Sequence, residues 1–248
     1  MDDIEKLKKE LSEWPDSALE KAIDLLGLNN GQKITVIDVG AHFGETLIGL
    51  IEKIKGGMRY ISFEPDECTF KKLESVCNSI QTESYEINCN CMAAGPMDCW
   101  IEFQKTKASE VSGILKPVTG LGERVLTGDH EVLEEIKVKQ IKIDTVVINQ
   151  EVAHIDILKV DAEGYDLKVL QGAFGSLKNQ KVSVVICEVF FVAYREGQAY
   201  FWDIAKYLEE CGYKFVNLFD ARETKQGRLY TANGVWVSEE IGKKNNYL

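Results

Sequence analysis

The sequence predicts an α/β fold in which helices cover both faces of a parallel, doubly wound sheet. From Ile34 onward, short apolar runs typical of buried strands alternate with segments of helical spacing. The first of these runs stops at a glycine turn and passes directly into a helix, as in open sheets that bind a ligand at their strand ends. A chain of 248 residues can bury a sizeable core in one such domain.

Each predicted element follows from its own apolar spacing. In the first predicted helix, Leu47, Leu50 and Ile51 fall on one face. Continuous β-branched runs indicate strands that are buried on both faces. The predicted strands are 34–39, 59–63, 84–89, 155–160, 182–188, 213–219 and 234–238, and the predicted helices are 45–55, 66–78, 166–174 and 199–211.

Residues 1–33 are predicted to form a helical extension that precedes the main domain, 34–248. Residues 1–12 have the pattern of a charged amphipathic helix. A second helix begins after Trp14-Pro15-Asp16 and ends before the helix-breaking residues 27–31. We expect these helices to cap the sheet or to pack on a partner subunit, which would give a homodimer.

The segment 108–136 interrupts the alternation of strands and helices. It carries five of the chain's glycines and prolines and lacks a clear periodicity, so we interpret it as an irregular insertion followed by a short helix. Loops above a sheet often carry specificity, and this insertion could serve as a substrate lid.

The run I-T-V-I-D-V-G-A-H-F-G at residues 34–44 says most about function. Its β-branched residues suit a buried strand, and Gly40 and Gly44 bracket a turn where the backbone can approach a ligand closely. A strand, a glycine turn and a helix together hold nucleotide-like ligands at the carboxyl ends of strands.

An acidic residue, Glu64, ends the second predicted strand twenty residues past Gly44, a position suited to binding both hydroxyls of a ribose. The dinucleotide fingerprint is absent, because His42 and Glu45 stand where it requires glycines. This loop suits a pyrophosphate poorly and disfavours a nicotinamide oxidoreductase. S-adenosylmethionine, which has a ribose and an amino-acid tail but no phosphate, is the better candidate.

A third segment, residues 155–173, reads I-D-I-L-K-V-D-A-E-G-Y-D-L-K-V-L-Q-G-A. With D-V-G-A-H-F-G at 38–44 and F-E-P at 63–65, it resembles the FkbM-type methyltransferases. Members of that family carry D-V-G-A-N-x-G, F-E-P and L-K-x-D-x-E-G-x-E-x-x-V-L-x-G-A. The resemblance covers about residues 34–240.

The resemblance implies an S-adenosylmethionine-dependent enzyme with the Rossmann-like class I methyltransferase fold, a mostly parallel seven-stranded sheet. Its final strands, here 213–219 and 234–238, would form an antiparallel hairpin. It also implies O-methylation of a hydroxyl on a small molecule or carbohydrate. The sequence departs from the family pattern at two positions, His42 in place of Asn and Asp166 in place of Glu.

The resemblance and the strand order together assign the cofactor contacts. The methionine end of the cofactor would meet the first glycine turn, the ribose would meet Glu64, and the adenine would lie near Cys91 and Met92. Asp161 would face the sulfonium. The full set of predicted cofactor residues is Asp38, Gly40, His42, Gly44, Thr46, Glu64, Cys91, Met92 and Asp161.

Three carboxylates are predicted to carry the chemistry. Asp161 and Glu163 follow the strand at 155–160, and Glu188 ends the next one. A hydroxyl acceptor must lose its proton, so one of them would act as a base. A divalent ion held by Asp161 and Glu188 is an alternative that we do not favour. Their structural alternatives are a helix cap for Asp161 and a strand-end ion pair for Glu188.

Other polar residues are weaker candidates for the base. Among the histidines, His154 is expected to be structural, whereas His130 lies in the predicted lid. Asp144 is expected to cap or turn the segment that follows Ile143. A different class of function, a non-catalytic binding subunit of the same fold, would be marked by a degraded cofactor motif, whereas Asp38, Gly40, Gly44 and Glu64 all remain here.

The composition disfavours several other classes of protein. A net charge of −11 disfavours a nucleic-acid partner, and no apolar stretch approaches the roughly 20 residues needed to cross a membrane. Seven cysteines with no export signal predict reduced thiols and a cytoplasmic protein. Cys89, Cys91 and Cys99 cluster, but without a fourth ligand at metal-binding spacing they are interpreted as buried thiols.

Overall fold

The computed structural model describes residues 16–28, 31–118 and 129–247. The helix predicted at residues 1–12 lies outside these ranges, as do the middle residues of the predicted lid, 119–128.

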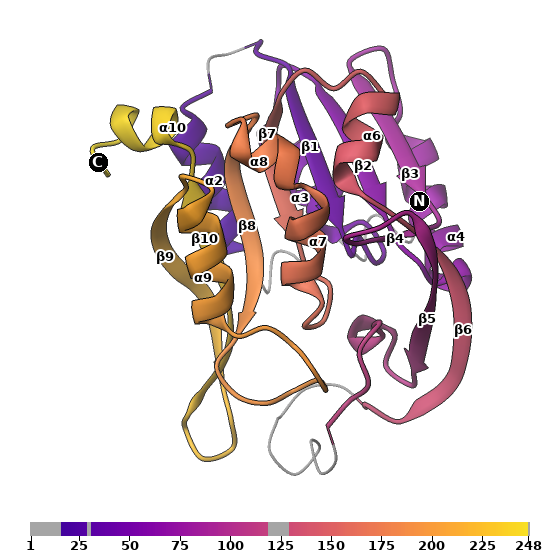
Figure 1. Ribbon diagram of the computed structural model, residues 1–248. Coiled ribbons are helices and arrows are strands. Elements are labelled where there is room, and N and C mark those ends of the chain that lie inside the picture. The colour runs from indigo at the N-terminus through magenta and orange to yellow at the C-terminus, as the bar shows by residue number, and fades with distance from the viewer. Residues whose placement is uncertain (1–15, 29–30, 119–128, 248) are drawn as a thin grey trace.

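A seven-stranded sheet forms the centre of the protein (Figure 1). Its first five strands in space run parallel, and β10 runs antiparallel to both of its neighbours, β8 and β9. This confirms the predicted doubly wound sheet and its antiparallel C-terminal hairpin. In spatial order the strands are β3 (Tyr85–Asn90), β2 (Met58–Phe63), β1 (Ile34–Val39), β7 (Ile155–Val160), β8 (Val182–Phe190), β10 (Leu229–Val237) and β9 (Lys214–Glu223).

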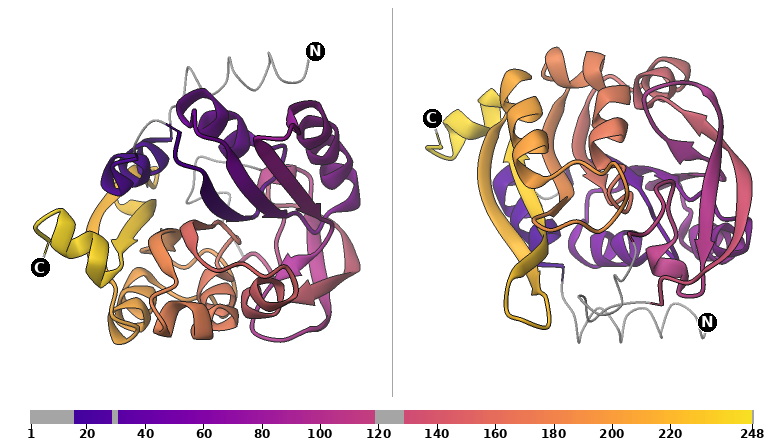
Figure 2. Two further views of the ribbon diagram at one scale, coloured as in Figure 1. Left: turned by 90° about the horizontal axis from the view of Figure 1, so that it is seen from above. Right: turned by 60° about the horizontal axis from the view of Figure 1, so that its bottom comes forward.

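Helices cover both faces of the sheet (Figure 2). One face carries α2 (Ser17–Leu26), α3 (Glu45–Lys53) and α4 (Glu67–Ile80). The other carries α6 (Ile143–Asn149), α7 (Asp166–Gly172), α8 (Phe174–Lys178) and α9 (Phe201–Glu210), and α10 (Glu239–Lys244) packs on β8 and β10. None of the helices in the described part of the chain is long and apolar enough to cross a membrane.

The sheet separates two hydrophobic cores. Successive side chains of a strand point to opposite faces, so Ile37 packs among α6, α7 and α9 while Val36 packs among α2, α3 and α4. Both side chains are fully buried. Burial on both faces explains why β1 reads as a continuous apolar run.

The segment predicted as one helix at 166–174 is two short helices, α7 and α8. Asp144 explains the break, because its carboxylate accepts hydrogen bonds from the backbone N–H groups of Gly175 and Ser176 and from the Ser176 hydroxyl. Asp144 therefore has a structural role, as expected, but it caps α8 instead of the segment that follows Ile143.

A second sheet of three strands was not predicted. It consists of β4 (Ala93–Ala94), β5 (Cys99–Thr106) and β6 (Val132–Ile141), with β6 between the other two. The short helix expected after the insertion is present as α6, but β6, which was not expected, covers Val132–Ile141 before it. Within the predicted lid, the structure describes one 3₁₀ turn, η1 (Ser109–Val111).

Helix α2 packs against its own sheet, with Leu19, Ala22 and Leu25 buried and with contacts to β8, β9 and β10. Its N-terminus is capped by Asp16, and Asp220 accepts hydrogen bonds from its first backbone N–H groups. Helix α2 therefore covers the sheet, as expected for the second helix of the extension. The homodimer stays a prediction.

The structure corrects the prediction for the cysteines. Cys89 forms a disulfide with Cys77, which joins β3 to α4, and Cys91 is exposed. The expectation of reduced, buried thiols in this cluster is therefore wrong, and this pair no longer supports a reducing compartment.

Candidate active site

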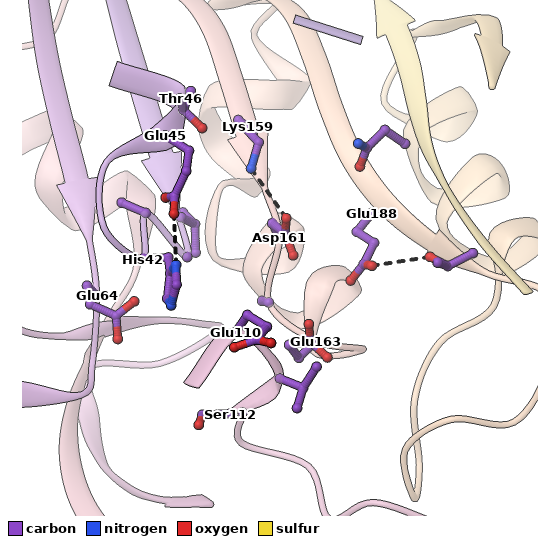
Figure 3. A pocket seen from close by; sticks show the side chains of 18 of the residues that line it. His42, Glu45, Thr46, Glu64, Glu110, Ser112, Lys159, Asp161, Glu163 and Glu188 are labelled. Carbon is purple, nitrogen blue, oxygen red and sulfur yellow. Dashed lines mark hydrogen bonds and ion pairs between the residues drawn. The ribbon is translucent and has the colours of Figure 1, made fainter. Parts of the chain in front are cut away.

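A cavity of about 980 Å³ lies at the carboxyl ends of the parallel strands. It opens beside the boundary between β1 and β7, where the chain order reverses and ligands bind in doubly wound sheets. Residues after β1, β2, β7 and β8, together with η1 and the β9–β10 hairpin, line it (Figure 3). A cavity of this size is large enough for a nucleoside-like ligand and a small acceptor.

The glycine turn after β1 brings the first and third sequence motifs together. Gly40 has a φ of 79°, and a Cβ there would lie 1.9 Å from the backbone oxygen of Asp161. The Asp161 N–H donates to the carbonyl of Val39 at 3.0 Å. Glycine is therefore required for the close approach of these two loops.

His42, where the family usually has Asn, connects this turn to η1. Its Nδ1 lies 3.0 Å from Oε1 of Glu45, and its Nε2 lies 3.0 Å from Oγ of Ser109. Burial alone would lower the pKa of His42, but the hydrogen bond and charge of Glu45 outweigh it and raise the pKa. His42 lines the cavity with both ring nitrogens already engaged.

The carboxyl of Glu64 sits at the end of β2 and is only 6% exposed. One of its oxygens accepts the Asp66 N–H at 2.9 Å. Burial raises the pKa of Glu64 to about 7. A buried carboxyl that lines a cavity in this way can accept hydrogen bonds from a ligand.

Not every predicted cofactor residue reaches the cavity. Gly40, His42, Thr46, Glu64, Met92 and Asp161 line it, whereas Asp38, Gly44 and Cys91 do not. Asp38 is fully buried beneath the turn, where the Tyr60 hydroxyl donates to it. The roles of these residues stay predictions, and an indirect role now suits Asp38 better than direct contact.

Lys159 also lies at the site, although the third sequence motif, which contains it, did not suggest a role for it. Its Nζ lies 3.4 Å from Oδ2 of Asp161 and 3.9 Å from Oδ1 of Asp38. Burial lowers the pKa of Lys159, but the charges of Asp161 and Asp38 raise it well above its usual value. A lysine inside a buried strand signals such partners, because unpaired charges are rarely buried.

The three carboxylates predicted to be catalytic come together (Figure 3). One oxygen of each lies within 4.8 Å of one oxygen of the others. The Asp161 side chain is 37% exposed, whereas that of Glu163 is 13% exposed. The predicted cap for Asp161 is instead supplied by Asp166, which accepts the backbone N–H groups of Ala162 and Gly164.

Glu163 is held by residues from the loop after β8. Its Oε2 accepts the Tyr194 hydroxyl at 2.5 Å and the Arg195 guanidinium at 2.9 Å. Arg195 is 2% exposed and also donates to the carbonyl of Val111 beside η1. No periodicity or motif in the sequence pointed to Arg195.

Glu188 forms no ion pair with any residue that the structure describes, so the strand-end ion pair considered as its structural alternative is not seen there. Its Oε1 accepts the Thr231 hydroxyl at 3.2 Å, and its Oε2 is buried without a hydrogen-bond partner among the same residues. Burial raises the pKa of Glu188 well above its usual value, and the neighbouring Asp161 and Glu163 raise it further.

The histidines considered as alternative bases lie elsewhere. His154 bonds the Ser183 hydroxyl at 2.8 Å, which fits the structural role expected for it. The ring of His130 packs edge-on against Tyr194, with ring centroids 5.4 Å apart. Neither is among the described residues that line the cavity.

The fold is that of the class I methyltransferases. One solved structure that the chain resembles is the methyltransferase FkbM from Methylobacillus flagellatus KT, with a TM-score of 0.53 and 19% identity over 85% of this chain and 45% of that one. This chain thus spans less than half of that protein. Another is the magnesium protoporphyrin IX methyltransferase from Synechocystis PCC 6803 with bound SAM, with a TM-score of 0.50 and 11% identity over 94% and 84% of the two chains.

The methyltransferase FkbM domain matches residues 38–215, so the chain belongs to the FkbM methyltransferase family. A comparison with curated proteins gives no significant match.

Proposed function

We propose that the protein transfers a methyl group from S-adenosylmethionine to a hydroxyl of a small molecule or sugar. The observation that carries this proposal is that the Gly40 turn, the buried Glu64 carboxyl and the Asp161 carboxylate line one cavity. Family membership supports the reaction class, and the hydroxyl preference comes from the family resemblance.

The residues of the cavity fit this cofactor. Glu64 would accept hydrogen bonds from the ribose hydroxyls, and the turn at Gly40 with Thr46 would hold the methionine end. Met92 and Phe103 offer apolar surface for the adenine, and the sequence reasoning did not include Phe103. When bound, the cofactor supplies an electrophilic methyl group on a sulfonium.

Asp161 is the residue that best suits the base. Its side chain is 37% exposed, whereas Glu163 is already bonded to Tyr194 and Arg195 and Oε2 of Glu188 is buried. The acceptor oxygen would bond to the methyl carbon as the carbon–sulfur bond breaks, and its proton would pass to Asp161. Much of the rate would come from holding both reactants in line.

A metal-dependent version of the reaction is the second candidate, because Asp161, Glu163 and Glu188 present hard oxygen atoms within 4.8 Å of one another. Held there, a divalent ion would polarise the acceptor hydroxyl. We expect EDTA to leave methyl transfer unchanged. The test is S-adenosylhomocysteine release before and after chelation, and a loss that Mg²⁺ restores would select the metal-dependent reaction.

The affinity for S-adenosylhomocysteine should rise from pH 6 to pH 8 and then level off, because the Glu64 carboxylate accepts ribose hydroxyls best when ionised and its pKa is about 7. The stability of the free protein against unfolding should change in the opposite direction and fall as the pH rises. The raised pKa favours folding below the usual 4.5, and this contribution is lost as the pH rises through 7. Calorimetry at constant ionic strength measures the affinity. Glu64→Gln should remove the rise, and any dependence that remains would belong to His42.

A further inference from the structure

We propose that the acceptor carries a protonated amine, which binds to Glu188 beside the hydroxyl that is methylated. This inference rests on the proposed function, because it names the chemical class of acceptor for the same cavity. Aminated sugars and aminocyclitols belong to that class.

The first support is the charge of the cavity wall. Among the described residues, eight carboxylate side chains line the cavity, and only Lys159 and Arg222 are permanent cations there. Such an imbalance favours a positively charged ligand and disfavours a carboxylate or phosphate.

Most of these carboxylates already have partners. Glu45 bonds His42, Asp161 lies beside Lys159, and Glu163 is paired with Arg195. Asp16 and Asp220 cap α2, and Glu64 would hold the ribose in the proposed function. Glu110 is exposed on η1, where water can solvate its charge.

Glu188 is the exception. Within the part of the chain that the structure describes, its Oε2 is buried and accepts no hydrogen bond, whereas the side chain as a whole lines the cavity and points toward Asp161 and Glu163 (Figure 3). Arg222 also lines the cavity and lowers the pKa of Glu188, but it forms no ion pair with it in the described structure. Ionising a buried carboxyl without a partner is costly, which agrees with the raised pKa of Glu188, so a cation from the ligand would stabilise its ionised form.

The surroundings of Glu188 suit an ammonium group. Tyr230 lines the cavity near Glu188, whose charge helps to raise the pKa of the Tyr230 phenol after burial, the largest cause. Thr231 and Asn233 add neutral polar groups that can bond the hydroxyls of a sugar or cyclitol.

The test is calorimetric titration of the protein saturated with S-adenosylhomocysteine, in buffer with EDTA. The probes are 2-deoxystreptamine, a cationic aminocyclitol, and myo-inositol, its neutral counterpart. We expect the amine to bind about 30-fold more tightly or better, the scale for a buried charge pair. Glu188→Gln should remove this preference and leave the S-adenosylhomocysteine affinity unchanged. Glu102→Gln, at an exposed position on β5 outside the cavity, is the matched control and should retain it.

Equal binding of the two probes to the wild-type protein would overturn the proposal, and this comparison does not depend on whether a variant folds. An amine preference that survives Glu188→Gln would also overturn it. In a parallel titration without EDTA, Mg²⁺ binding that requires Glu188 would assign the position to a metal ion instead. If S-adenosylhomocysteine itself fails to bind, the proposed function is wrong, which is a different result from loss of the amine preference alone.

Discussion

Glu64→Ala should lower the affinity for S-adenosylhomocysteine by about 100-fold or more, because two hydrogen bonds from ribose hydroxyls to a carboxylate contribute about 1.5–3 kcal/mol each. In the wild-type protein, ligand at 100 times its Kd stabilises the fold by about 2.7 kcal/mol. That corresponds to a rise in Tm of about 5–10 °C for a chain of this length. The variant should show almost none of this rise in a thermal melt at the same ligand concentration.

Glu67→Ala is the matched control for this experiment. Glu67 lies three residues further on, is exposed at the start of α4 and does not line the cavity, so the ligand should still raise the Tm of this variant. If the ligand raises the Tm of Glu64→Ala as much as that of the wild-type protein, the ribose must bind elsewhere in the cavity. No binding to the wild-type protein would end the assignment as an S-adenosylmethionine-dependent enzyme.

The centre of the sheet could be predicted from the sequence because β1, β2, β7 and β8 are buried on both faces. Such strands read as continuous apolar runs, and the alternation of these runs with helical segments specifies parallel pairing. The ends of the elements were less predictable. The helix predicted at 166–174 breaks because Asp144, about 30 residues away, caps α8, and no local pattern reports such a contact.

The three-stranded sheet did have a signal that the prediction missed. In β6, Ile136 and Val138 alternate with the exposed residues Glu135, Lys137 and Lys139, the period-two pattern of a strand with one face in water. The glycine-rich residues that precede β6 conceal this pattern, because they make the whole segment 108–136 resemble an irregular insertion.

The sequence predicts which residues lie at the site, but it does not predict which of them bond to one another. Asp161 and Glu188 meet because the carboxyl ends of neighbouring parallel strands lie at one edge of the sheet. The partner of Glu163 is Arg195, which reaches it from a loop 32 residues away. That pairing distinguishes Glu163 from Asp161, and it depends on tertiary structure alone.

Asp161→Asn should lower the rate of methyl transfer by about 10²-fold or more, the usual scale for losing a general base. The change is nearly isosteric. Lys159 would keep Asp38 as its nearby carboxylate, so the fold should hold. The measurement is S-adenosylhomocysteine release during a single turnover with an acceptor from the amine series. The affinity for S-adenosylhomocysteine, determined by calorimetry, should change far less than the rate.

Asp156→Asn provides the control on the same strand, because Asp156 bonds the backbone N–H of Thr35 and does not line the cavity. It should leave the rate unchanged. If Asp161 has only a structural role, Asp161→Asn should also leave the rate unchanged, because Asn preserves the shape of the side chain. If Asp161→Asn and Glu188→Gln both keep a near-normal rate, neither carboxylate removes the proton. The base would then lie in the segment 108–136, where His130 is the first residue to replace, because it already packs against Tyr194 at the wall of the cavity.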